Sequence, residues 1–186
     1  FPWHQAYENF YGEYSRLCRV DLLAPTQALE MEARCVVETG TATLYRTIAA
    51  STSEPVLCQL ASRIAADEVR HYKYFYRFFQ RFRDREGTGR LAIAEALWRK
   101  RAEIRDDDIR LAFKHCFEAR HPGKRTTPAD FNPYWRQMLV LMRDHYPIDM
   151  AVRMILKPLD LRPAVGRIVL PLASMAARSA LHNLMR

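Results

Sequence analysis

The sequence is poor in glycine, which destabilises helix interiors. Only 6 of its 186 residues are glycine, and no stretch alternates apolar and polar residues as a half-buried strand does. Alanine, leucine, arginine, glutamate and methionine, which favour helices, are common. These features argue against a sheet-based fold and predict an all-α chain. With 49% apolar and 27% charged residues, the composition is that of one globular domain over residues 1–186.

The sequence also lacks a long apolar run and a paired cysteine motif. Its longest apolar run, Ile168 to Ala177, has about ten residues, whereas a helix needs ~20 to span a bilayer, so we expect no membrane span. No signal peptide is visible, and the first residue is Phe1 rather than Met, which suggests that an N-terminal portion precedes this sequence. The cysteines form no CxxC pair and favour reduced core thiols in a cytoplasmic protein: Cys18, Cys35, Cys58 and Cys116.

Acidic residues are in the minority, with 21 Asp and Glu against 29 Lys and Arg, which gives a net charge of +8. An excess of this size fits an acidic partner such as nucleic acid, an anionic membrane surface or an acidic carrier protein. The arginines are dispersed along the chain, however, and this favours a solvated helix surface over a nucleic-acid or membrane partner.

Periodicity and capping residues divide the chain into helical segments. Thr26 is a candidate N-cap for a first long helix, and Ser53 for a second that Gly87 closes. Gly40 within the first helix indicates either a close helix contact or a local π-bulge. We expect an aromatic lead-in segment without a long helical period (1–25), a helix hairpin (26–84), further bundle helices (90–158, with a fourth helix opening at Asn132-Pro133) and a basic amphipathic C-terminal helix (163–186).

Three residues of the hairpin have the spacing of metal ligands. Glu38 lies in the middle of an apolar stripe on the first helix, and Glu68 and His71 lie three residues apart on the predicted inner face of the second. Buried carboxylates need arginine pairing, protonation or a bound cation. Mixed carboxylate and imidazole ligands suit iron or manganese. The alternative is a buried polar network in which His71 is a hydrogen-bonded core histidine.

The outer face of the same helix is expected to be ordinary surface. Asp67 and Arg70 are spaced to pair there, which leaves Glu68 as the inward carboxylate.

The two stretches resemble a known superfamily. Glu38-Thr39-Gly40-Thr41 followed by Ile64-Ala65-Ala66-Asp67-Glu68-Val69-Arg70-His71 is similar to the second half-site of the soluble acyl-carrier-protein desaturases, and both stretches resemble bacterial ferritin-like domain proteins. The resemblance implies a ferritin-like antiparallel helical bundle, a di-iron centre with Glu38, Glu68 and His71 as ligands, and Thr41 near the oxygen-binding side as a catalytic hydroxyl.

In these families a second Glu and a second Glu-x-x-His come from two earlier helices, which this chain lacks in recognisable form. Glu8 is followed by Tyr11 where a histidine is expected, and the other candidates are Glu95 and the reversed pair His115 and Glu118. Three explanations stay open, in this order: an N-terminally shortened protein, two copies that pair their hairpins as a homodimer, or an incomplete site.

Three functions fit these observations. The first is a dioxygen-dependent oxidase, oxygenase or desaturase-like enzyme with an apolar or acyl-carrier substrate. The second is iron or peroxide handling of the ferritin or rubrerythrin kind, which a net charge of +8 disfavours. The third is a non-catalytic helical module with a degenerate metal site that docks on lipid or nucleic acid through the C-terminal helix.

Overall fold

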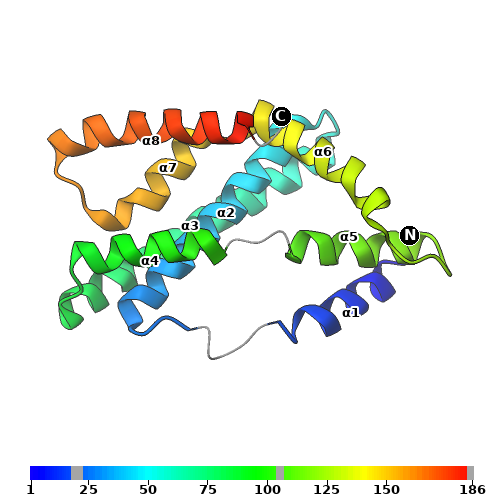
Figure 1. Cartoon of the computed structure of the whole chain (residues 1–186), viewed down its shortest axis with the longest axis horizontal. Coiled ribbons are helices and arrows are strands. Elements are labelled where there is room, and N and C mark those ends of the chain that lie inside the picture. The colour runs from blue at the N-terminus through cyan, green and yellow to red at the C-terminus, as the bar shows by residue number, and fades with distance from the viewer. Residues whose placement is uncertain (18–22, 104–106, 184–186) are drawn as a thin grey trace. The chain divides into compact units, whose positions relative to one another are not determined.

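The computed structural model describes residues 1–17, 23–103 and 107–183. Within these ranges the chain forms eight α-helices, one short 3-10 helix and no strand, which confirms the predicted all-α fold (Figure 1). The chain falls into two compact units. The first comprises Phe1–Leu23 and Ala102–Gln137, and the second comprises Ala24–Arg101 and Met138–Arg186.

The first unit contains helix α1 (Trp3–Tyr14), helix α5 (Asp107–Arg120) and the beginning of helix α6 (Pro128–His145). The expectation that the lead-in segment has no long helical period is wrong, since α1 is a regular helix. Helix α6 also begins before the predicted Asn132-Pro133. The Thr127 backbone N–H and hydroxyl both donate to the Asp130 carboxylate, and this cap starts the helix one turn earlier.

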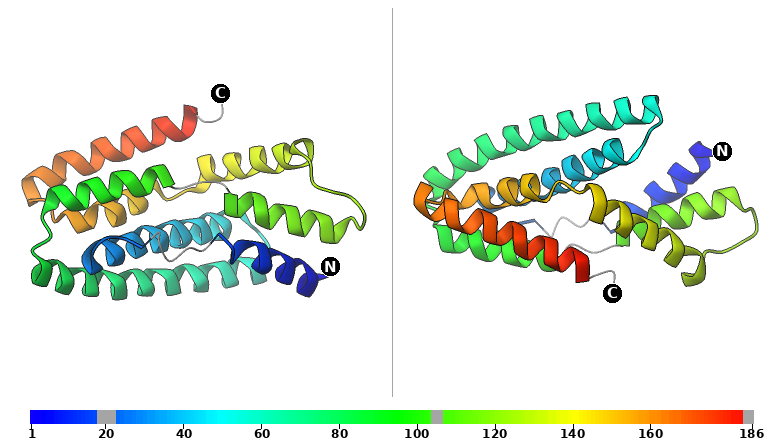
Figure 2. Two further views of the ribbon diagram at one scale, coloured as in Figure 1. Left: turned by 60° about the horizontal axis from the view of Figure 1, so that its bottom comes forward. Right: turned by 90° about the horizontal axis from the view of Figure 1, so that it is seen from above.

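Helices α2 (Gln27–Ser51) and α3 (Pro55–Glu86) form the antiparallel hairpin of the second unit (Figures 1 and 2). The predicted cap of α2 is confirmed, because the Thr26 hydroxyl accepts a hydrogen bond from the Leu29 N–H at 3.3 Å. The predicted cap of α3 is wrong. Glu54 rather than Ser53 is the N-cap, and its carboxylate accepts from the backbone N–H groups of Val56 and Leu57.

The far end of the hairpin fixes its register. The Glu86 carboxylate accepts hydrogen bonds from the N–H groups of Gln27 and Ala28, so the last turn of α3 caps the first turn of α2. Gly87 then ends α3 in the left-handed conformation with a φ of 65°. This pairing sets the middle of α2 beside the middle of α3.

The contact between the two helices is formed by small side chains and by threonines that hydrogen-bond within their own helix. Buried residues of α2 include Cys35 and Ala42, and those of α3 include Ala61 and Ala65. Buried threonines of α2 bond carbonyls one turn earlier in their own helix, which lets them face the interior: Thr39, Thr43 and Thr47.

Gly40 has neither of the roles expected from the sequence. It lies in a continuous α-helix rather than a π-bulge, and a Cβ added there would meet no atom within 4 Å. Among the described residues, therefore, no other helix approaches it closely.

Further helices complete the second unit. Helix α4 (Arg90–Glu103) brings Ile93 into a buried cluster with Ala28, Leu29 and Phe79. The predicted third helical region is thus two helices, α4 and α5, and residues 104–106 lie outside the described ranges. Helix α7 (Ile148–Leu156) follows α6 and is held to α3 by the Tyr72 hydroxyl, which donates to the Met154 carbonyl at 2.7 Å.

A 3-10 turn, η2 (Lys157–Leu159), leads from α7 to helix α8 (Pro163–Asn183). Among the described residues, α8 is the one helix long and apolar enough to cross a membrane by length and composition. The expectation of no membrane span therefore stays a prediction. Small residues extend the apolar helix beyond the ten-residue run, and only 6% of the helix window is buried.

Candidate metal centre

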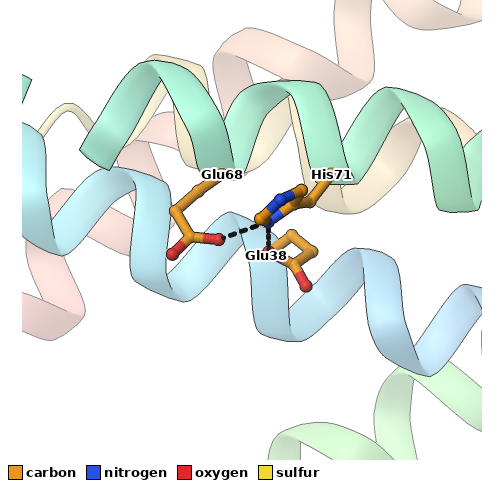
Figure 3. A group of neighbouring side chains, drawn as sticks. All are labelled: Glu38, Glu68 and His71. Atoms are coloured by element: carbon orange, nitrogen blue, oxygen red, sulfur yellow. Dashed lines mark hydrogen bonds and ion pairs between the residues drawn. The ribbon is translucent and has the colours of Figure 1, made fainter. Parts of the chain in front are cut away.

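The structure brings together the three residues with metal-ligand spacing. Glu38 lies in the middle of α2, and Glu68 and His71 lie one turn apart on the facing part of α3. One ligand atom from each residue lies within 4.8 Å of the others. His71 Nδ1 is 3.1 Å from Glu68 Oε2 and 3.7 Å from Glu38 Oε2 (Figure 3). Two carboxylates and one imidazole thus converge on a single point.

The charges in this group require compensation. Burial, together with the neighbouring Glu68 carboxyl group, raises the pKa of Glu38 to about 7, and the opposing effect of His71 is smaller. Two adjacent carboxylates cannot both ionise cheaply unless a proton or a cation lies between them. The arrangement therefore favours either a shared proton or a bound cation.

The group lies at an open edge of the hairpin rather than in its core. The Glu38 and Glu68 side chains are 14% and 19% exposed, but the His71 side chain is 59% exposed. The prediction that all three residues face inward is therefore wrong for His71. The buried residues of α3 lie to one side of His71, on the side that packs against α2: Ala61, Ala65, Tyr72 and Phe79.

The face of α3 that carries Glu68 and His71 also exposes apolar side chains. Leu57 and Leu60 are 43% and 53% exposed, and Ile64 and Phe75 are half-buried. Monomeric proteins rarely leave large apolar patches open to water, and such patches mark surfaces that bind another element or a ligand. The candidate metal ligands therefore lie beside a surface suited to further contacts.

The other hairpin predictions have mixed outcomes. Asp67 and Arg70 pair on the outer face of α3, as predicted. The Thr41 hydroxyl hydrogen-bonds the backbone carbonyls of Val37 and Glu38, each at 3.3 Å. Its proposed catalytic role stays a prediction.

The candidates outside the hairpin have partners within their own units. Glu95 forms an ion pair with Arg99, and Glu118 accepts a hydrogen bond from the Thr126 N–H. His115 is buried, and its Nε2 lies 3.0 Å from Glu13 Oε2.

Glu8 likewise pairs locally, with His4 in its own helix. Among the described residues, no second group of three potential ligands accompanies Glu38, Glu68 and His71.

Sequence reasoning missed one buried carboxylate, that of Glu32. The residue is 1% exposed, and its Oε1 makes no hydrogen bond among the described residues. Burial raises its pKa to about 7, and the positive charge of Lys100 opposes that rise. The available signal was its spacing: Glu32 lies four residues after Ala28 and three before Cys35, both buried on the same face of α2.

The cysteines agree in part with the expected reduced thiols. Cys35, Cys58 and Cys116 are free, but only Cys35 is fully buried, and Cys18 lies outside the described residues.

Comparison of the chain with protein-family models, curated proteins and solved structures finds no match.

Proposed function

We propose that Glu38, Glu68 and His71 form one half of a carboxylate-bridged di-metal centre in a ferritin-like antiparallel bundle. The observation that carries this proposal is the convergence of their ligand atoms within 4.8 Å from two antiparallel helices. Helical di-metal proteins build their centres from one Glu on one helix and Glu-x-x-His on another, supplied twice. Iron is the favoured metal for this donor set, with manganese as the alternative.

Three donors leave metal positions for ligands from outside the hairpin. The exposed His71 imidazole and the uncovered apolar face of α3 support a second helix pair at this edge. A second copy of the chain, presenting the same three residues, is one source of that pair. Such a homodimer would bury both apolar faces and complete the donor set.

The favoured activity is that of an oxidase, oxygenase or desaturase-like enzyme acting on an apolar or carrier-bound substrate. Bound iron supplies the redox activation of dioxygen. The residues of this chain would hold and orient the metal. Burial and the Glu68 carboxyl group raise the pKa of Glu38 to about 7, so its carboxylate can hold a proton when no cation is bound.

Metal titration of the purified chain tests the proposal. Isothermal titration with Mn²⁺, and with Fe²⁺ under anaerobic conditions, should give stoichiometric binding. His71→Ala removes a direct ligand, so it should weaken binding by at least the roughly 10- to 100-fold that loss of an outer-shell partner causes. Asp67→Asn is the matched control, since Asp67 lies on the same helix but faces outward toward Arg70. Absence of binding by the wild type, or an equal loss in both variants, would contradict the assignment.

Iron stoichiometry and native mass then test the half-site. A completed centre predicts two irons per pair of copies, an oxo-bridge absorption band after exposure to air, and a dimer that forms with the metal. A monomer that binds a single iron and shows no such band would argue for metal binding without the di-iron chemistry.

A second candidate function rests on helix α8. Ile168, Leu172 and Met175 are 64%, 58% and 65% exposed along one side of it, and α8 contains no acidic residue. These features favour a helical module that docks on an anionic membrane surface. Co-sedimentation with phosphatidylglycerol vesicles that weakens as salt rises would support it, whereas a chain that stays in the supernatant would rule it out.

A further inference from the structure

A hollow of about 670 Å³ lies between the C-terminal half of α3, helix α7, the η2 turn and the start of α8. The volume lies within the range of small-molecule sites, and the hollow is open to solvent rather than enclosed. None of the residues that line it is Glu38, Glu68 or His71, so this pocket is distinct from the candidate metal centre.

The walls of the pocket are largely aliphatic. Leu156 comes from the end of α7, Leu161 from the following loop, and Leu170 and Pro171 from α8. Gly166 leaves a gap in the α8 wall, because a Cβ built there would meet no atom within 4 Å. The interior therefore suits an apolar chain better than a polar ligand.

Three cationic side chains also line the pocket: Arg153, Lys157 and Arg167. Lys157 Nζ lies 4.5 Å from the centre of the Tyr76 ring, and Arg153 Nε donates to the Asp149 backbone carbonyl of its own helix. Within the described ranges, no carboxylate forms an ion pair with any of these three cations.

The one acidic residue of the lining does not neutralise them. The Asp160 carboxylate already pairs with two arginines from elsewhere in the unit, Arg83 at 3.8 Å and Arg90 at 3.6 Å. Arg90 also donates to the Asp160 backbone carbonyl at 2.8 Å. The pocket thus combines an apolar interior with an excess of positive charge.

We propose that this pocket binds an anionic amphiphile, with a hydrocarbon chain against Leu156, Leu161 and Leu170 and the anionic head against Arg153, Lys157 and Arg167. Apolar burial accounts for affinity, and the cations select an acidic head over a neutral one. A free fatty carboxylate and an acidic membrane lipid share this chemistry and are its two sources.

Fluorescence displacement and calorimetry with oleate test the proposal on the whole chain. We expect saturable binding of one oleate per chain, and at least tenfold weaker binding of oleyl alcohol, which has the same chain without the charge. Gly166→Phe should fill the pocket and abolish oleate binding. Ile168→Phe is the matched control, because it adds a ring to the same helix on its exposed side.

A second pair of variants tests the charge. Lys157→Gln combined with Arg167→Gln should weaken oleate binding about tenfold and leave oleyl alcohol unchanged. Arg178→Gln should leave both unchanged, since Arg178 pairs with Asp149 and does not line the pocket. Circular dichroism confirms that each variant folds.

The outcomes separate the sources and the alternatives. Phosphatidylglycerol vesicles that compete with oleate for the wild type, but do not bind Gly166→Phe, would identify a membrane lipid as the source. Oleate binding without such competition would identify a free fatty carboxylate. No saturable oleate binding, or equal binding by Gly166→Phe and Ile168→Phe, would overturn the proposal.

Discussion

Replacing Glu32 with glutamine should remove a pH-dependent loss of stability. Glu32 is 1% exposed, and burial raises its pKa from 4.5 to about 7. A carboxyl group whose pKa is higher in the folded than in the unfolded state stabilises the fold while it is protonated. That contribution is complete below about pH 4.5 and is lost as the pH rises through about 7.

The magnitude follows from the two pKa values. At 1.36 kcal/mol for each tenfold change in the ionisation equilibrium, a rise from 4.5 to about 7 corresponds to about 3 kcal/mol. About 2.5 kcal/mol of this is lost between pH 5 and pH 8, because ionisation of the unfolded state has already begun at pH 5. Glutamine has nearly the same shape but does not ionise, so Glu32→Gln should lack this part of the pH dependence.

Urea unfolding followed by circular dichroism at pH 5, 6, 7 and 8 measures the effect. The difference in unfolding free energy between Glu32→Gln and the wild type should rise in favour of the variant by about 2.5 kcal/mol from pH 5 to pH 8. Comparing two proteins cancels the background from Glu38, whose pKa is also raised. Glu95→Gln is the control, since Glu95 is 66% exposed. A difference that is the same at pH 5 and pH 8 would refute the reasoning.

Two substitutions test the helix ends and interior. Glu54→Ala should destabilise the protein by about 1 kcal/mol, because it removes the carboxylate that caps α3. Ser53→Ala should have little effect, and equal losses of stability in the two variants would contradict the assigned cap. Gly40→Ala should stabilise the protein by up to ~1 kcal/mol, since Gly40 lies within α2 with open space around it. A lower melting temperature would show that the site does not tolerate a Cβ.

Local signals in the sequence were sufficient to place the helix hairpin. Thr26, Pro55 and Gly87 act directly on the backbone of the helices they bound, so their roles do not depend on tertiary contacts. The helix at Trp3–Tyr14 was not predictable in the same way. Glu13 of this helix contacts Lys114 and His115, which lie far away in the sequence, so no local pattern predicts the contact.

The convergence of Glu38, Glu68 and His71 was predictable from the sequence, but their burial was not. The three-residue spacing of Glu68 and His71 places them on one side of any α-helix, whatever surrounds that helix. Which side of α3 is covered depends instead on where α2 and α7 lie. Tyr72, for example, is buried, and its hydroxyl donates to the Met154 carbonyl of α7.

The Glu32 and Glu38 carboxylates of helix α2 both have pKa values raised by desolvation, but their surroundings differ. Desolvation is the main cause of the raised pKa of Glu32, and no second carboxylate or imidazole gathers around it among the described residues, so protonation is the response open to it. Glu38 faces both desolvation and the Glu68 carboxyl group, and its ion-pair partner in the described structure is the exposed imidazole of His71. A single proton would neutralise one carboxylate of the Glu38–Glu68 pair and leave the other negatively charged, whereas a cation would offset both negative charges. This difference favours Glu38, rather than the more deeply buried Glu32, as the candidate metal ligand on α2.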